Sequence, residues 1–325
     1  MSTSNAMLSI RELSVAFPTV PRSVVAVDRL SLDLHPGEVT ALIGESGSGK
    51  SATILALLGL LPAGAVVSGE MIIGEERLAL ADERALARLR GRVFGAVFQD
   101  PLASLNPVLT IGEQIEEVFR AHRSLDRAQA RRASINLLDR VGLPDPAARA
   151  RDYAHRLSGG QRQRAAIAMA LAGRPRVLLA DEPTSALDPT VQAQILDLLL
   201  DLVQEGTALL LVTHDLAFAA EAADRIAVIY AGHILEHGPV AEVARAPAHP
   251  YTQALLAASL PYGAVGSGSL PGIPGRMPAP GEAMPGCIFA PRCPQVRAIC
   301  RQGQPPVVAM GERKVACVLA KGGAP

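Results

Sequence analysis

The chain has 325 residues, of which 49% are hydrophobic and 19% are charged. This balance is sufficient for one or two domains with a buried core and excludes wholesale disorder. Lysine plus arginine and aspartate plus glutamate each total 31, so the formal net charge is +0. A general nucleic-acid coat needs a basic excess, so that class is excluded. The longest uncharged stretch, residues 51–69, contains Pro62 and glycines, which predicts a buried helix and a loop rather than a membrane span.

The first predicted elements are strands. Leu30, Leu32 and Leu34 alternate with polar residues, a period of two that is typical of a half-buried strand. Residues 39–43 form a short apolar run without alternation, as expected for a strand covered on both faces. A glycine-rich turn and an apolar helical stretch follow this run.

The middle of the chain predicts helices. Apolar residues at positions 111, 115, 118 and 119 share one helical face. A second stripe at positions 135, 138 and 141 ends at Gly142 and Pro144, which are residues that stop helices.

Strands then return in alternation with a helix. Residues 177–180 and 209–212 are apolar runs separated by the helical stretch 191–203, which predicts an α/β core with a parallel sheet. Residues 226–230 and 234–236 predict a hairpin near the edge of that sheet. From Pro261 onward, prolines and glycines predict a linker, followed by a small appendage that contains all four cysteines.

One segment predicts a phosphate site. It fits the pattern G-x-x-x-x-G-K-[ST], and its residues are Gly44, Glu45, Ser46, Gly47, Ser48, Gly49, Lys50 and Ser51. Glycines let backbone N–H groups surround phosphate oxygens, and the following helix N-terminus favours an anion. We expect Lys50 to reach the β- and γ-phosphates and Ser51 to bind Mg²⁺.

A second segment complements the first. The apolar run 177–180 ends in Asp181 and Glu182. We expect Asp181 to hold Mg²⁺, directly or through water, and Glu182 to orient and polarise the attacking water.

A third motif identifies the family that the chain resembles. Leu157, Ser158, Gly159, Gly160 and Gln161 match the signature of ATP-binding cassette (ABC) ATPases. Ser158 can cap a helix through residues 165–172, and the two glycines leave its first N–H groups open to an anion. The resemblance implies that this signature completes the ATP site of a second cassette when two cassettes close head to tail.

Further motifs of the same family follow in the family's order. Gln99 resembles the Q-loop glutamine that senses Mg²⁺, and His214 resembles the switch histidine that contacts the γ-phosphate. Phe17 resembles the aromatic residue that stacks on adenine. The D-loop is represented by Ser185, Ala186, Leu187 and Asp188.

The resemblance implies an α/β fold of the ABC ATPase (P-loop NTPase) class with an antiparallel β subdomain and a helical subdomain. We expect an ATPase domain at residues 7–260, with the helical part at about 100–165, and an extension at 261–325 that carries the cysteines. Implied partners are a second ABC ATPase subunit, identical or different, two membrane permeases and, indirectly, an extracytoplasmic solute-binding protein. The implied location is the cytoplasmic face of the cell membrane, and no nucleic-acid partner is expected.

Three segments are similar to one branch, the ATPases of dipeptide, oligopeptide and nickel importers. They are residues 98–107, residues 249–256 and the run from residue 272 to residue 294. The branch implies ATP-driven import of peptides, with nickel, glutathione or another small solute as the alternative. An exporter and a non-transport ABC ATPase of DNA repair or ribosome function are further alternatives, and the latter would need a coiled-coil insertion or two cassettes in one chain.

The cysteines, Cys287, Cys293, Cys300 and Cys317, do not show the paired C-x₂-C spacing of a zinc ribbon. Four thiolates suit either a [4Fe–4S] cluster or Zn²⁺ by ligand count. Since some members of the importer branch carry a cluster in this tail, we expect a [4Fe–4S] cluster with a structural or docking role, and Zn²⁺ or no metal are the alternatives.

Overall fold

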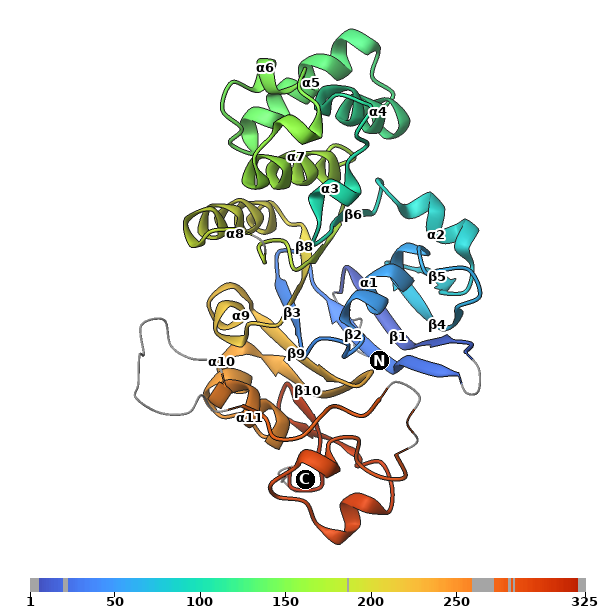
Figure 1. Cartoon of the computed structure of the whole chain (residues 1–325). Helices are drawn as coiled ribbons and strands as arrows, with labels where there is room; N and C mark the ends of the chain where they lie inside the picture. The colour runs from blue at the N-terminus through green and yellow to red at the C-terminus, as the bar shows by residue number, and fades with distance from the viewer. Residues whose placement is uncertain are drawn as a thin grey trace. The chain divides into compact units, whose positions relative to one another are not determined.

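The computed structural model describes residues 6–19, 23–185, 187–258, 272–279, 282 and 284–320 (Figure 1). The chain forms two compact units. One contains Met1–Met7, His35–Gly37 and Arg84–Leu211, and the other contains Leu8–Leu34, Glu38–Glu83 and Val212–Pro325. We call them the helical unit and the phosphate-loop unit. None of the described helices has the length and apolar character needed to cross a membrane.

The phosphate-loop unit begins with an antiparallel sheet. Its strand order is β2 (Val24–Leu34), β1 (Leu8–Phe17), β4 (Val66–Ile73) and β5 (Glu76–Ala79). Ile10 lies opposite Leu32 on one side and opposite Met71 on the other. The alternation predicted around Leu32 is confirmed, since the leucines of that stripe are buried.

A second sheet in this unit has the order β11 (Val307–Met310), β12 (Arg313–Ala316), β10 (His233–Pro239), β9 (Arg225–Tyr230) and β3 (Val39–Ile43). Strand β3 is fully buried, as predicted, and runs parallel to β9. The predicted β9–β10 hairpin is confirmed. Its β10 strand is not the outermost, however, because the tail strand β12 pairs with it and β11 follows.

Short helices complete the phosphate-loop unit. The helix α1 (Lys50–Leu58) ends at Gly59, whose φ of 61° is left-handed, so the uncharged stretch is a helix followed by a loop as far as β4. The remaining helices are α9 (Leu216–Ala222), α10 (Val240–Arg245), α11 (Pro250–Ala258) and the 3₁₀ turns η2 (Ala290–Arg292) and η3 (Ala298–Arg301).

The helical unit contains strands β6 (Phe94–Val97), β7 (Val177–Asp181) and β8 (Ala208–Thr213), and the chain leaves this unit within β8. Strand β6, which the sequence pattern does not predict, runs parallel to β7, in agreement with the predicted parallel sheet. The helices are α2 (Glu83–Leu89), α3 (Pro101–Ser104), α4 (Ile111–Arg123), α5 (Arg127–Arg140), α6 (Pro146–Arg149), η1 (Ala154–Arg156), α7 (Gly159–Leu171) and α8 (Pro189–Gln204).

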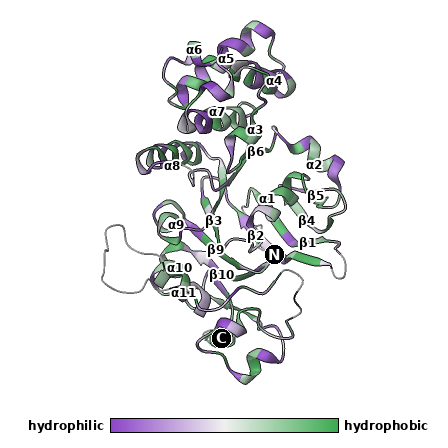
Figure 2. Ribbon diagram, viewed as in Figure 1, coloured by the Kyte–Doolittle hydropathy of each residue, from purple (hydrophilic) through white to green (hydrophobic). Residues whose placement is uncertain are grey.

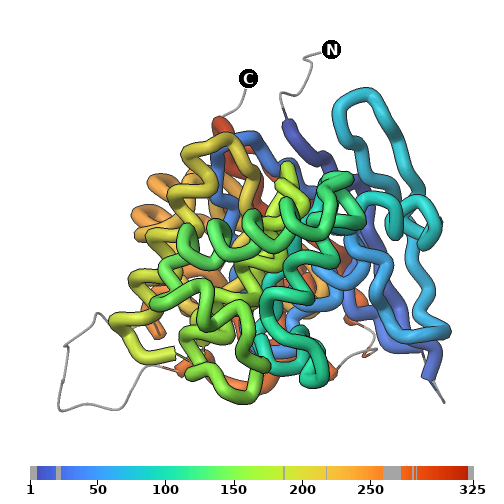
Figure 3. The backbone as a smooth tube through the Cα atoms, turned by 90° about the horizontal axis from the view of Figure 1, so that it is seen from above, coloured from blue at the N-terminus to red at the C-terminus, as the bar shows by residue number. Residues whose placement is uncertain are grey.

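Helices α4 and α5 lie side by side in Figure 3 and contact each other. Both begin with a capping box, in which Thr110 pairs with Glu113 and Asp126 pairs with Gln129. Hydrophilic residues dominate α5 (Figure 2), so its caps and its narrow buried stripe around Leu138 define the helix.

An aromatic cluster joins the tail to the body of the phosphate-loop unit. Phe289 is 0% exposed and lies edge-on to Tyr230, with ring centroids 5.3 Å apart. Its centroid is also 5.3 Å from that of Tyr251 on α11 and 5.9 Å from that of His249. The tail is therefore anchored at the end of β9 by burial of aromatic surface.

Replacing Phe289 with alanine should remove this anchor. We expect a loss of about 3–5 kcal/mol in the free energy of unfolding, because a fully buried ring leaves a cavity. Thermal melting and limited proteolysis of the tail would measure it. Ile299→Ala is the matched control, since Ile299 is 56% exposed. Equal melting temperatures for the two variants would contradict the anchor.

Candidate nucleotide site

The phosphate loop connects β3 to α1, and its backbone packs too closely for side chains at two positions. A Cβ atom on Gly44 would overlap the carbonyl oxygen of Ile229 and lie 2.7 Å from Oγ of Ser48. Gly49 has a φ of 109°, and a Cβ atom there would overlap the carbonyl oxygen of Ala26. Glycine at both positions is therefore a geometric requirement of this loop.

Lys50 lies within this loop rather than in solvent. Its side chain is 6% exposed, and its Nζ donates to the carbonyl oxygens of Gly44 at 2.7 Å and Glu45 at 3.0 Å. Ser51, in the first turn of α1, is exposed. The loop thus presents an ammonium group and a hydroxyl at the start of a helix, the chemistry that binds phosphate and Mg²⁺.

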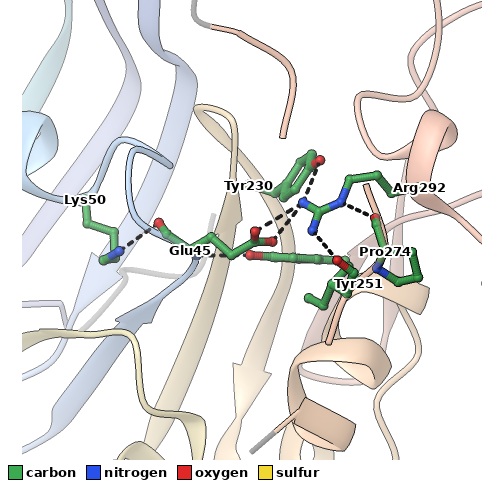
Figure 4. Close-up of polar contacts among 7 residues, drawn as sticks. Glu45, Lys50, Tyr230, Tyr251, Pro274 and Arg292 are labelled. Carbon is green, nitrogen blue, oxygen red and sulfur yellow. Dashed lines mark hydrogen bonds and ion pairs between the residues drawn. The ribbon is translucent and has the colours of Figure 1, made fainter. Parts of the chain in front are cut away.

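Two residues that the sequence patterns do not predict contact Glu45 (Figure 4). Arg292 of the tail forms an ion pair with the Glu45 carboxylate at 3.0 Å, and the Glu45 N–H donates to the Tyr251 hydroxyl at 3.1 Å. Burial raises the pKa of Tyr251, so its hydroxyl stays protonated. Arg292 and Tyr251 lie within the segments used for the family resemblance, but nothing in their spacing links them to the loop.

Phe17 and the phosphate loop line the same pocket, of about 550 Å³. Phe17 is half-buried at the end of β1, and Gly47, His233 and the tail residue Met277 also line the pocket. His214 belongs to the phosphate-loop unit and is exposed, directly after the end of β8.

The helical unit carries the predicted acidic pair. Asp181 is the last residue of β7 and is 9% exposed. Glu182 adopts a left-handed φ of 45°, unusual for this residue type and typical of strained functional positions. Gln99 Nε2 donates to Glu182 Oε2 at 3.4 Å, so two predicted catalytic residues are in contact.

The signature motif forms the start of α7, as predicted. Ser158 caps the helix by accepting from the Gln161 N–H, and Gln161 accepts from the Ser158 N–H at 3.0 Å. A Cβ atom on Gly160 would lie 2.9 Å from Val191 of α8. In the D-loop, Asp188 caps α8, while Ala186 lies outside the described residues.

The cysteines of the tail are all free and line one small cavity together with His249 and Phe289. Burial raises the pKa of the Cys287 and Cys293 thiols. Within the described part of the chain, no three histidine, cysteine or acidic side chains are arranged to hold a single metal ion.

Comparison with known proteins identifies the family. A family profile described as "ABC transporter" matches residues 27–185, and one described as "Oligopeptide/dipeptide transporter, C-terminal region" matches residues 235–300. A putative peptide import ATP-binding protein of Brucella ovis is 47% identical over 319 residues, covering 94% of each chain. The chain belongs to the ABC transporter family. It is the subunit of such a transporter that hydrolyses ATP.

Other relatives of this ABC subunit agree. The dipeptide transport ATP-binding protein DppD of Haemophilus influenzae is 46% identical, covering 96% of this chain and 95% of that protein. Among solved structures, the ATP-binding cassette MJ0796, a dimer in a post-hydrolysis state with ADP and Pi, has a TM-score of 0.64 and 29% identity. That match covers 72% of this subunit and 99% of MJ0796. The predicted ABC fold is therefore confirmed.

Gly44→Ala should displace the phosphate loop, because the new Cβ atom and the Ile229 carbonyl group cannot occupy the same space. We expect MgATP affinity to fall about tenfold or more, with a stability loss of about 1–3 kcal/mol. Titration calorimetry and thermal melting would measure the two effects. Gly303→Ala, where a Cβ atom meets no atom of the described residues within 4 Å, is the control and should behave as wild type.

Proposed function

We propose that this ABC subunit hydrolyses ATP to drive the import of dipeptides or oligopeptides across the cell membrane. The observation that carries the ATPase chemistry is the buried Lys50 within a loop that tolerates only glycine at Gly44. Peptide as the cargo is supported by the matched oligopeptide/dipeptide C-terminal region and by relatives named for peptide and dipeptide transport.

The nucleotide would be held by the phosphate-loop unit. Lys50 would exchange its bonds to loop carbonyls for phosphate oxygens, and the N–H groups of residues 44–51 would surround the phosphates. Phe17 would pack on adenine, which its place in the same pocket as Gly47 supports. His214 would contact the γ-phosphate.

The remaining predicted site residues would bind Mg²⁺ and activate water for ATP hydrolysis. Ser51 of the phosphate-loop unit would be a Mg²⁺ ligand, and Gln99 and Asp181 of the helical unit carry further side-chain oxygen atoms of the kind that Mg²⁺ prefers. When bound, Mg²⁺ neutralises charge that develops on the phosphates. Glu182 would accept a proton from the attacking water, and its contact with Gln99 supports the pairing of these two residues.

A second cassette would complete the site. Leu157, Ser158, Gly159, Gly160 and Gln161 would face the partner's nucleotide from the start of α7, with residues 185–188 at the dimer contact. The dimeric state of the MJ0796 structure supports this arrangement. Two permeases and a solute-binding protein outside the membrane would complete the transporter. This subunit would lie at the cytoplasmic face of the membrane, and it would consist of an ATPase domain at residues 7–260 and the extension that follows.

Glu182→Gln tests the catalytic assignment. Phosphate release should fall by about 10²–10⁴-fold, because water activation is lost, whereas MgATP should still bind and hold the cassettes closed. The rate is measured in native membranes. A tagged Glu182→Gln subunit pulled down with ATP should carry two permeases and a second cassette, identified by mass spectrometry.

Lys50→Ala is the matched control and should lose MgATP binding, so its pull-down should recover fewer partners. A Glu182→Gln subunit that turns over at the wild-type rate would overturn the role of Glu182. Recovery of soluble proteins alone would overturn the transport assignment, and a nickel- or glutathione-binding receptor in place of a peptide receptor would overturn the cargo.

We further propose that Cys287, Cys293, Cys300 and Cys317 hold a [4Fe–4S] cluster. The four thiols line one cavity, and Nε2 of His249, at the same cavity, is buried without a hydrogen-bond partner among the described residues. The cavity is about 20 Å³, so the cysteines must spread when the group binds. When bound, such a cluster would cross-link the tail through four Fe–S bonds.

Anaerobic purification of the full chain should yield about four iron and four sulfide per chain, with broad absorbance at about 400 nm. The double variant Cys287→Ser/Cys300→Ser should lose both signals. Zinc in place of iron, or no metal in the wild type, would contradict the cluster.

A further inference from the structure

Arg292 connects three segments of the phosphate-loop unit that are distant in sequence (Figure 4). Its Nη1 donates to both Glu45 carboxylate oxygens, at 3.0 and 3.2 Å, and to the Tyr230 hydroxyl at 3.3 Å. Its Nε donates to the Pro274 carbonyl oxygen at 2.9 Å, and its Nη2 to that of Ile273 at 3.1 Å. The side chain is 4% exposed, so all three nitrogens are bonded within the protein.

Glu45 is the second residue of the phosphate loop, and three groups contact it. Its carboxylate receives Arg292, its N–H donates to Tyr251, and its carbonyl oxygen accepts from Lys50 at 3.0 Å. Arg292 and the phosphate-binding lysine thus act on the same residue. Only Glu45 stands between Arg292 and Lys50 in this chain of contacts, so a substitution of Arg292 can affect Lys50 through Glu45.

The tail also reaches the nucleotide pocket by a second route. A Cβ atom on Gly47 would lie 3.4 Å from Cε of Met277, and Met277 lines the pocket that contains Phe17. Met277 follows the Ile273–Pro274 carbonyls that Arg292 binds by only three residues. The same guanidinium therefore fixes the loop on one side and the tail segment that lines the pocket on the other.

We propose that Arg292 is a positioning residue of the nucleotide site, which neutralises Glu45 and holds it away from the phosphates, so that the C-terminal tail sets the affinity for MgATP. This rests on the proposed assignment of the phosphate loop. A carboxylate at the second position of a phosphate loop repels a triphosphate unless a cation compensates it. Because the Arg292 side chain is 4% exposed and that of Glu45 is 32% exposed, solvent ions screen this compensation only in part.

The test compares three variants of the full chain: Arg292→Gln, Glu45→Gln and the double variant. Titration calorimetry measures the affinity of each for AMP, for MgATP and for a non-hydrolysable analogue of MgATP. Arg292→Gln should weaken MgATP binding about tenfold, and AMP binding far less, because the effect follows phosphate charge. Glu45→Gln should bind MgATP more tightly than wild type. The double variant should recover to within about threefold of Glu45→Gln, and Arg292→Lys should keep most of the affinity.

Substitutions of two other arginines are the controls that distinguish an effect on the nucleotide site from an effect on the folding of the tail. Arg313 anchors the tail elsewhere, donating to the Ala246 carbonyl oxygen at 2.6 Å, and Arg301 is exposed. Arg313→Gln should lower the melting temperature without altering the MgATP/AMP affinity ratio, and Arg301→Gln should change neither.

Wild-type affinity in Arg292→Gln, or a double variant as weak as Arg292→Gln, would overturn the role of Arg292. So would an Arg313→Gln variant that loses the same MgATP/AMP ratio, because the effect would then belong to tail folding. Lys50→Ala distinguishes a failure of the phosphate-loop assignment from a failure of the role of Arg292. If Lys50→Ala binds MgATP as wild type does, the phosphate-loop assignment fails. If Lys50→Ala loses MgATP binding while Arg292→Gln binds as wild type does, only the inference on Arg292 is refuted.

Discussion

The contact of the phosphate loop with two backbone carbonyl groups is the constraint on which the nucleotide site depends. Gly44 packs directly against the carbonyl oxygen of Ile229 at the end of β9. Gly49 packs in the same way against the carbonyl oxygen of Ala26 in β2. The Ser48 carbonyl accepts from the Gly232 N–H at 2.8 Å, in the turn after β9. Both sheets of the unit therefore determine where the loop lies. Because backbone atoms cannot move aside as side chains do, the loop has little freedom to adjust.

The tail is attached at the same end of β9, where Tyr230 directly follows Ile229. Two kinds of interaction act there, and their magnitudes differ. Burial of Phe289 against Tyr230 and Tyr251 contributes several kcal/mol of stability. A partly buried ion pair such as Arg292–Glu45 contributes little net stability, because the desolvation of Arg292 offsets its attraction to Glu45. The aromatic residues therefore hold the tail in place, and the ion pair defines the position of Glu45.

The parts of the fold that follow from local pattern could be predicted from the sequence. The buried run at β3, the caps of Ser158 and the hairpin of β9 and β10 all depend on neighbouring residues and are confirmed. The strands β11 and β12 were missed because they are short, and a pairing such as Glu236 with Val315 joins residues far apart in the chain. No local period specifies which edge a distant strand will extend.

The same distinction holds for the site. The phosphate loop was evident because its chemistry lies in eight consecutive residues, whereas the cation that compensates Glu45 lies in the tail. Arg292 is one of many arginines in the sequence, and only the fold shows that it is buried. The contact between Gln99 and Glu182 likewise depends on where β6 and β7 end, which the order of motifs does not give.

The position of Arg292 also depends on the cysteines, because it is the last residue of η2 and Cys293 follows it directly. The η2 turn is held between the Cys287 carbonyl, which accepts from the Ala290 N–H at 3.0 Å, and the Cys293 N–H, which donates to the Ala290 carbonyl at 3.4 Å. The Cys287 N–H in turn donates to the Cys300 carbonyl at 2.7 Å, and a Cβ atom on Gly286 would overlap that carbonyl. The backbone that places the thiols around their cavity is thus the backbone that directs Arg292 toward Glu45. A tail that kept its aromatic anchor but lost this backbone arrangement would remain attached without holding the phosphate loop.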